Sequence, residues 1–191
     1  DQVADLAGLP QSSQLGFSVI PPEIELRRGV LAIEGTINSE YIEIAPSIAA
    51  QARSRSEVIV VRAFSSVTRD SVIDSRAFPK SEIKWIEFNG KRGNDYLWVA
   101  EIDIPVTAKG GDGNDYLEGG RLDDCLIGGP GDDILIGNRG NDELFGCQGN
   151  DTLYGGTSDD TLNGGFGADD FHGGLGVDTL TGAQGADKLE G

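Results

Sequence analysis

Histidine and basic side chains are scarce in this chain of 191 residues, and each shortage excludes a class of function. His172 is the only histidine, so neither the H-E-x-x-H zinc motif of metalloproteases nor a Ser-His-Asp triad is expected. The G-x-S-x-G motif of lipases does not occur in the sequence. We therefore expect no enzymatic activity from this chain.

Charge and hydropathy exclude two further classes. The chain holds 32 Asp and Glu residues against 15 Lys and Arg, a net charge of −17. A chain this acidic is not expected to bind the phosphate backbone of nucleic acids. No apolar run approaches the roughly 18 residues that predict a transmembrane helix. The sequence opens at Asp1 without a basic, apolar leader, so it is not expected to include a signal peptide.

Glycine and aspartate, in contrast, are abundant and regularly spaced. Nine consecutive nonapeptides run from Gly110 to Glu190, each with Gly at position one, Asp at position six and Leu or Phe at position eight. The first is GGDGNDYLE, and two well-kept later ones are GGPGDDILI and GGLGVDTLT. One GGxGxD segment alone would be weak evidence, because Gly-Asp turns are common. Nine in phase without an insertion indicate a repeat architecture.

The pattern G-G-x-G-x-D-x-U-x resembles the calcium-binding repeat of RTX (haemolysin-type) proteins. The resemblance covers residues 90–191 and implies an all-β fold, a right-handed parallel β-roll or β-helix solenoid with calcium-binding turns. In such a roll, two nonapeptides make one coil. Each repeat then divides into a six-residue turn and a three-residue strand, whose position-eight side chain points inward.

The resemblance also implies the metal ligands. Aspartates eighteen residues apart would face each other across successive coils, with one calcium ion between each pair. Two carboxylates and carbonyl oxygens of the glycine-rich turns would supply the six to eight oxygens that calcium prefers. The array offers seven such pairs, and Asp95 in GKRGNDYLW could stack on Asp115 as an eighth. The predicted ligand residues are Asp95, Asp115, Asp124, Asp133, Asp142, Asp151, Asp160, Asp169, Asp178, Asp187, Gly111, Gly113, Gly129, Gly131, Gly140, Gly149, Gly165, Gly167, Gly174 and Gly176.

Not every turn fits the pattern equally. Leu122 and Ser158 replace glycine at position four, where a positive φ is expected, and a bulky residue is costly in that conformation. We expect distorted or weak sites at these two turns. The additional acids at position five, Asp123, Asp132 and Asp159, are expected to lie on a solvated face of the turns.

Calcium is expected to control folding. Residues 90–191 hold 20 acidic side chains against 6 basic ones, and 22 of the 81 residues in the array are glycine. Stacked carboxylates repel one another, and glycine is costly to order. Because extracellular calcium modules bind at about 10⁻⁴–10⁻³ M, the array should be disordered in the cytosol and ordered outside the cell. Export by type I secretion is what the resemblance implies.

The residues before the array divide into two expected segments. Residues 1–30 predict an irregular arm or cap, and residues 31–109 predict metal-free β-solenoid coils with degenerate repeats, ahead of the calcium-binding roll of residues 110–191. In Gly35–Glu43 the nonapeptide register persists, with Glu40 at the aspartate position. A small separate β-sandwich is the alternative. The expected strands are Leu31–Ile33, Tyr41–Ile44, Val58–Val61, Ile83–Phe88 and Tyr96–Ile104.

Outward strand positions indicate the kind of partner. Ile134, Ile136 and Tyr154 should be neighbours on one sheet, and Cys125, Ile127 and Phe145 on the other. Such apolar patches favour contact with another chain, although scattered exposed apolar residues are also ordinary. Cys125 and Cys147 are expected on different edges of the roll, too far apart for a disulfide; an intermolecular bond is the alternative.

We therefore expect an extracellular calcium-binding structural or assembly protein, a cell-surface, matrix or filament component that folds and self-associates when calcium is present. The alternative is the calcium-dependent folding and secretion module of a larger secreted enzyme, toxin or adhesin.

Overall fold

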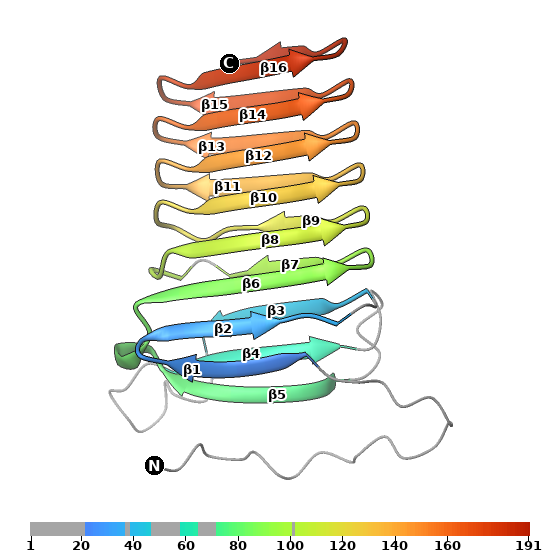
Figure 1. Cartoon of the computed structure of the whole chain (residues 1–191). Coiled ribbons are helices and arrows are strands. Elements are labelled where there is room, and N and C mark those ends of the chain that lie inside the picture. The colour runs from blue at the N-terminus through green and yellow to red at the C-terminus, as the bar shows by residue number, and fades with distance from the viewer. Residues whose placement is uncertain (1–21, 37–38, 47–57, 65–71, 101) are drawn as a thin grey trace.

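The structure, a computed structural model, describes residues 22–36, 39–46, 58–64, 72–100 and 102–191. Two β-sheets face each other along the length of the molecule (Figure 1). The first contains, in order of hydrogen-bonded neighbours, β1 (Glu23–Arg27), β2 (Val30–Glu34), β6 (Trp85–Arg92), β8 (Val106–Asp112), β10 (Cys125–Pro130), β12 (Glu143–Gln148), β14 (Thr161–Phe166) and β16 (Thr179–Gln184). The second contains β17 (Lys188–Glu190), β15 (Asp170–Leu175), β13 (Thr152–Thr157), β11 (Ile134–Arg139), β9 (Tyr116–Glu118), β7 (Tyr96–Val99), β3 (Tyr41–Pro46), β4 (Val58–Phe64) and β5 (Val72–Pro79). A short 3₁₀ helix, η2 (Lys80–Glu82), joins β5 to β6.

From β8 onward the chain alternates between the two sheets, and each strand pairs in parallel with the strand one coil later. Leu126 lies opposite Leu144 in the first sheet, and Leu135 lies opposite Leu153 in the second. Both pairs are eighteen residues apart, so two nonapeptides make one coil. The predicted all-β fold, a solenoid of the parallel β-roll type, is confirmed.

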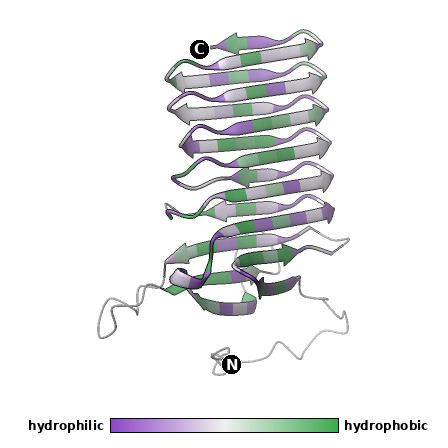
Figure 2. Cartoon of the chain, turned by 60° about the vertical axis from the view of Figure 1, so that its left-hand side comes forward, coloured by the Kyte–Doolittle hydropathy of each residue, from purple (hydrophilic) through white to green (hydrophobic). Residues whose placement is uncertain are grey.

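The core of the roll is a double row of position-eight side chains. The period of two along a strand turns these residues inward and their neighbours outward, and Figure 2 shows hydrophobic segments recurring from strand to strand. Seven of them have no exposed surface: Leu117, Leu126, Leu135, Leu144, Leu153, Leu162 and Phe171. Each buried side chain of this size contributes about 1.5–3 kcal/mol to folding.

The first strands form a different kind of structure from the repeats. β1 pairs with β2 in an antiparallel ladder, and β3, β4 and β5 form a second antiparallel ladder. Residues 23–27, expected within an irregular arm, are a strand. Within residues 31–109, β2 pairs in parallel with β6 and β3 with β7, as expected for solenoid coils, whereas the antiparallel pairings of β4 with β3 and β5 differ from that expectation. Residues 1–21 of the arm predicted for residues 1–30 lie outside the described residues. Large apolar side chains such as Ile59 and Phe88 form the core here.

One expected strand is shorter than predicted. The apolar run Tyr96–Ile104 leaves the sheet after Val99, where β7 ends. Ile102 and Ile104 are nevertheless buried, 2% and 3% exposed. The apolar run thus predicted the burial of these residues correctly but the length of the strand wrongly. An apolar pattern does not distinguish a buried strand from a buried connection.

The last coil of the roll is open to solvent. Leu189 occupies an inward position but is 50% exposed, whereas Phe171, one coil earlier, is fully buried. Phe166, Leu175 and Val177 are also exposed near this end.

Candidate metal centres

The turns between the sheets have a backbone shape that few residues tolerate. Their second and fourth residues take a positive φ, as at Gly129 (127°) and Gly131 (144°). A Cβ on Gly131 would lie closer than 3.0 Å to the carbonyl oxygen of Gly113 in the preceding coil. At Gly131 glycine therefore serves close stacking as well as conformation, although Asn138, Cys147, Ser158 and Ala183 adopt a positive φ in other turns.

The position-six aspartates form two hydrogen-bonded ladders, one on each edge of the roll. In each step, Oδ1 of an aspartate accepts a hydrogen bond from the backbone N–H of the aspartate one coil earlier. The Asp115 N–H donates to Asp133 at 2.8 Å, and the Asp133 N–H donates to Asp151 at 2.9 Å. One ladder consists of Asp95, Asp115, Asp133, Asp151, Asp169 and Asp187, and the other of Asp124, Asp142, Asp160 and Asp178. All ten predicted aspartates, Asp95 included, are thus brought into stacked pairs.

In seven of these ten aspartates the second carboxylate oxygen is left without a partner among the described residues. Oδ2 is buried and accepts no hydrogen bond from any described residue in Asp95, Asp115, Asp133, Asp142, Asp151, Asp160 and Asp169. A buried, uncompensated carboxylate oxygen is costly. A row of them indicates a ligand with positive charge.

Sequence reasoning did not include the first glycine of each turn among the site residues, yet the structure places it beside the unpartnered oxygen. A Cβ on Gly137 would lie closer than 3.0 Å to Asp142 Oδ2 and 2.7 Å from the carbonyl oxygen of Gly155, one coil later. The equivalent atoms one coil later surround Gly155: a Cβ there would lie closer than 3.0 Å to Asp160 Oδ2 and to the carbonyl oxygen of Gly173. The sequence did contain a signal for these site residues, because glycine occupies position one in all nine repeats.

The predicted glycine residues at positions two and four lie in the same turns. The carbonyl oxygen of one coil lies against the Cα of the glycine one coil later, so that a Cβ on Gly129 would lie closer than 3.0 Å to the Gly111 carbonyl oxygen. Their assignment as calcium ligands remains a prediction. The set comprises Gly111, Gly113, Gly129, Gly131, Gly140, Gly149, Gly165, Gly167, Gly174 and Gly176.

Burial disfavours the ionised form of the aspartates unless a cation lies beside them. Desolvation is the main cause that raises their pKa, and neighbouring carboxylates raise several of them further, against the backbone N–H bonds that lower it. The pKa rises to about 8 for Asp95 and Asp142, about 7 for Asp124 and Asp133, and about 6 for Asp115 and Asp151. At neutral pH, the negative charge of those aspartates that ionise requires compensation by a proton or a cation.

The donor atoms fit calcium. They are all carboxylate or carbonyl oxygens, which calcium and other hard cations prefer. No group of three or more His, Cys, Asp or Glu side chains converges anywhere in the described part of the chain. A cation between two stacked carboxylates would therefore need further oxygen ligands, and the carbonyl oxygens of the turns lie nearby. Calcium tolerates such irregular shells better than magnesium does.

Position five carries a further ladder that the sequence did not reveal. The side-chain oxygen of each position-five residue accepts a hydrogen bond from the backbone N–H of the position-five residue one coil later. In the position-six ladder the donor N–H belongs to the earlier coil instead. Asp132 Oδ1 accepts from Asn150 N–H at 2.7 Å, and Asn114 Oδ1 accepts from Asp132 N–H at 3.1 Å. Asp and Asn serve equally here, and both are exposed. The expected solvated face is also a structural ladder.

The two turns expected to be distorted behave differently. Leu122 avoids a positive φ, and its turn rearranges so that the Gly120 N–H donates to Asp124 Oδ2 at 2.6 Å. Ser158 instead accepts a φ of 92°, and its N–H keeps the regular hydrogen bond to the Leu175 carbonyl at 2.7 Å. The distortion predicted at Leu122 is present, and the turn at Ser158 is regular.

The cysteines lie on neighbouring strands of one sheet, not on different edges as expected. Cys147 pairs with Gly129, four residues along β10 from Cys125. Four strand residues span about 13 Å, beyond the reach of a disulfide, and both thiols are free.

A family model agrees with this geometry. The RTX calcium-binding nonapeptide repeat matches in four copies, over residues 109–144, 122–153, 145–180 and 172–191. No curated protein and no solved structure matches the chain significantly. Among the described residues, no helix is long and apolar enough to cross a membrane. Residues 109–191 are therefore RTX calcium-binding nonapeptide repeats, and they form a β-solenoid of the parallel β-roll type.

Proposed function

We propose that this chain is an extracellular calcium-binding structural or assembly protein whose roll folds, and then self-associates, when calcium binds. The rows of buried, unpartnered Asp Oδ2 atoms are the observation that carries the proposal. They give the folded chain an electrostatic cost that calcium ions between stacked coils would remove. The position-six aspartates, with carbonyl oxygens of the turns, are the proposed ligands, in up to seven or eight sites.

The extracellular location follows from the calcium concentration that such sites require. RTX repeat proteins are typically secreted, and extracellular calcium modules bind at about 10⁻⁴–10⁻³ M. Cytosolic calcium lies far below this range, so the roll would order only after export. A binding and structural role, without catalysis, is the role we propose.

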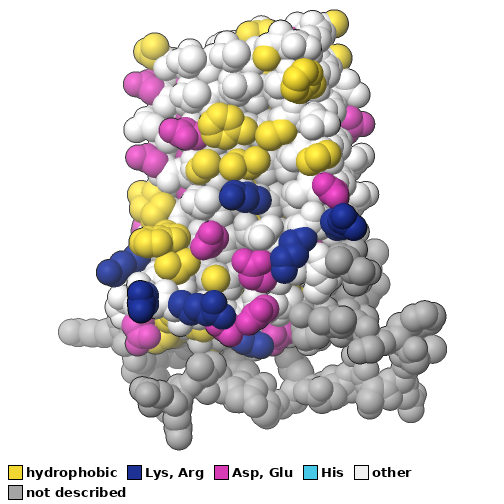
Figure 3. Space-filling view, viewed as in Figure 1, with side chains coloured by type: hydrophobic (Ala, Val, Ile, Leu, Met, Phe, Trp, Pro, Cys, Tyr) yellow, Lys and Arg dark blue, Asp and Glu magenta, His cyan; other side chains and the backbone are white. Residues whose placement is uncertain are grey.

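Two groups of apolar side chains on the outer surface support assembly. The first lies on the outer faces of the sheets, where half-buried Ile136 lies beside exposed Tyr154 in the second sheet and half-buried Ile127 lies beside half-buried Phe145 in the first. On the face of the first sheet, hydrophobic side chains gather above a region richer in Lys and Arg (Figure 3). The second group, which we call the C-terminal apolar group, consists of Phe166, Leu175, Val177 and Leu189, exposed by 58%, 73%, 81% and 50%.

The C-terminal apolar group lies around β16 and β17, which are the outermost strands of the two sheets at the C-terminal end of the roll among the described residues. An open sheet edge with exposed apolar residues is a template for pairing with another chain. We therefore propose end-on association of rolls through the last coil.

Light scattering coupled to gel filtration, with and without calcium, tests assembly. We expect particles larger than a monomer in calcium and monomers in EGTA. The double variant Leu175→Gln, Val177→Thr should remain monomeric in calcium, whereas Leu122→Gln, a control at an exposed leucine outside this group, should associate like the wild type. Monomers at every calcium concentration would favour the folding module of a larger secreted protein instead.

A further inference from the structure

Glu40 occupies, in the coil before Asp95, the place that an aspartate occupies in the repeats. Tyr41 pairs with Tyr96 and Ile42 with Leu97, which places Glu40 next to Asp95. The Glu40 N–H donates to Asp95 Oδ1 at 2.6 Å, the bond that links each aspartate to the next coil. The ladder therefore continues one coil beyond the predicted sites.

The carboxylate of Glu40 is also buried and incompletely paired. Its residue is 7% exposed, and Asp95 is 2% exposed. Glu40 Oε1 accepts a hydrogen bond from the Thr36 hydroxyl. Glu40 Oε2 and Asp95 Oδ2 find no hydrogen-bond partner within the described ranges. Two acidic groups thus meet in one buried place, each with a free oxygen.

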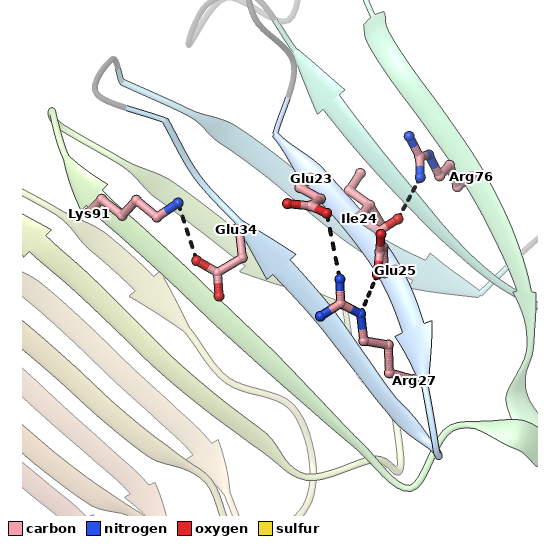
Figure 4. A network of polar contacts seen from close by, with 7 residues as sticks. All are labelled: Glu23, Ile24, Glu25, Arg27, Glu34, Arg76 and Lys91. Carbon is pink, nitrogen blue, oxygen red and sulfur yellow. Dashed lines mark hydrogen bonds and ion pairs between the residues drawn. The ribbon is translucent and has the colours of Figure 1, made fainter.

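The nearest basic side chains of this coil are engaged elsewhere. Lys91 lies one residue after Gly90, but its Nζ points to Glu34 Oε2 at 3.3 Å (Figure 4). Arg62 pairs with Glu43 at 3.0 Å, on the outer side of β3. Within the described ranges no ion pair joins a basic side chain to Glu40 or Asp95, so protons or a bound cation would compensate these two acids.

Backbone oxygens complete the surroundings of Glu40 as they do in the repeats. A Cβ on Gly35 would lie 2.9 Å from Glu40 Oε2, 3.0 Å from the Asn89 carbonyl oxygen, and closer still to the carbonyl oxygen of Gly90. Gly90, one coil later, has the same relation to Asp95 Oδ2 and the Gly110 carbonyl. The polar atoms around Gly35 are thus the carboxylate oxygen of Glu40 and the carbonyl oxygens of Asn89 and Gly90. Oxygen ligands of this kind suit a hard cation.

We propose that Glu40 and Asp95, with the carbonyl oxygens of Asn89 and Gly90, bind one further calcium ion. This site lies outside the RTX repeats, within the coils that the sequence analysis expected to be metal-free. It would join β3, which begins the antiparallel ladder, to the parallel roll. It rests on calcium binding by the repeats but not on assembly, so the scattering experiment above can fail without affecting it.

Counting bound ions by native mass spectrometry, on the full chain at a calcium concentration that just saturates the wild type, tests the site. Glu40→Gln should bind one ion fewer than the wild type. Glu87→Gln is the matched control, because Glu87 is an exposed glutamate of β6, and it should bind the wild-type number. An unchanged ion count in folded Glu40→Gln would overturn the proposal.

A second measurement covers the case in which Glu40→Gln does not fold. Crystals of the wild-type chain grown with calcium, or with terbium in its place, should give an anomalous peak about 2.3–2.6 Å from Glu40 Oε2. A peak between Asp115 and Asp133 with none at Glu40 would overturn this site while leaving the repeat sites standing. Absence of both peaks would count against calcium binding by the chain as a whole.

Discussion

Neighbouring aspartates in one turn have opposite roles at the residue scale. Asp133 is 1% exposed and has one unpartnered oxygen, whereas Asp132 is exposed and uses a single oxygen as a hydrogen-bond acceptor. An amide oxygen can replace the acceptor at Asp132, as Asn114 and Asn150 already do in the same ladder. It cannot replace the charge at Asp133.

Asp133→Asn is therefore predicted to remove two calcium ions, because Asp133 stacks on both Asp115 and Asp151. At calcium tenfold above the dissociation constant, two sites contribute about 3 kcal/mol, and the variant should lose roughly that stability. Isothermal titration calorimetry and urea unfolding measure the two quantities. Asp132→Asn is the control, and equal losses in both variants would contradict the assignment.

How far the sequence alone predicts the site also depends on the residue. The phase of the array was sufficient to find the aspartates, because identical residues at a fixed spacing must stack once the coil has eighteen residues. The contribution of Gly137, and of the other position-one glycines, depends on contacts across coils that no single repeat displays. The interaction between Glu40 and Asp95 joins residues 55 positions apart, so the nonapeptide spacing could not reveal it.

At the scale of the elements, the turn is the unit that determines whether a site can form. Gly146 packs so closely on Asp151 that a Cβ would lie under 3.0 Å from three of its side-chain atoms. Nothing lies within 4 Å of a Cβ added to Gly191. The two glycines therefore separate the effect of crowding the site from the general effect of a methyl group.

Gly146→Ala is predicted to destabilise the calcium-bound roll by about 1–3 kcal/mol, the usual cost of overpacking, and to raise the calcium concentration at the folding midpoint. Gly191→Ala should leave both unchanged. Circular dichroism during a calcium titration measures the midpoints. If Gly146→Ala folds at the wild-type midpoint, the turn is not the compact cradle described above.

Strands were easier to predict than their partners. The run Val58–Val61 predicted the start of β4 correctly, because consecutive β-branched residues favour extended backbone. The same pattern does not specify whether a strand pairs in parallel or antiparallel. The antiparallel ladder of β3, β4 and β5 was therefore missed, whereas the repeat period itself fixed the parallel register farther on.

At the scale of the whole molecule, protons and calcium should compete for the same carboxylates. The folded-state pKa values, about 6 to about 8 for the aspartates from Asp95 to Asp151, lie above the value of about 4 in an unfolded chain. Folding therefore favours the protonated form. Without calcium, the stability that these groups contribute is fully present below about pH 4 and is lost as the pH rises through 6 to 8.

In EGTA, the chain is predicted to hold more β-structure at pH 5 than at pH 8. Far-UV circular dichroism measures this difference, with potassium chloride at pH 8 as a control for screening of exposed charges. The salt should restore little of the structure, because the paired carboxylates are buried. Greater order at pH 8 than at pH 5, without calcium, would show that the buried aspartates do not control folding.

Calcium removal is the most direct test of the central claim, that cations between stacked turns hold this roll together. Small-angle X-ray scattering at neutral pH compares the chain in excess calcium with the same chain in EGTA. We predict a compact elongated particle in calcium and an expanded chain in EGTA, reversed when calcium is restored. An identical compact particle in both solutions would contradict the account.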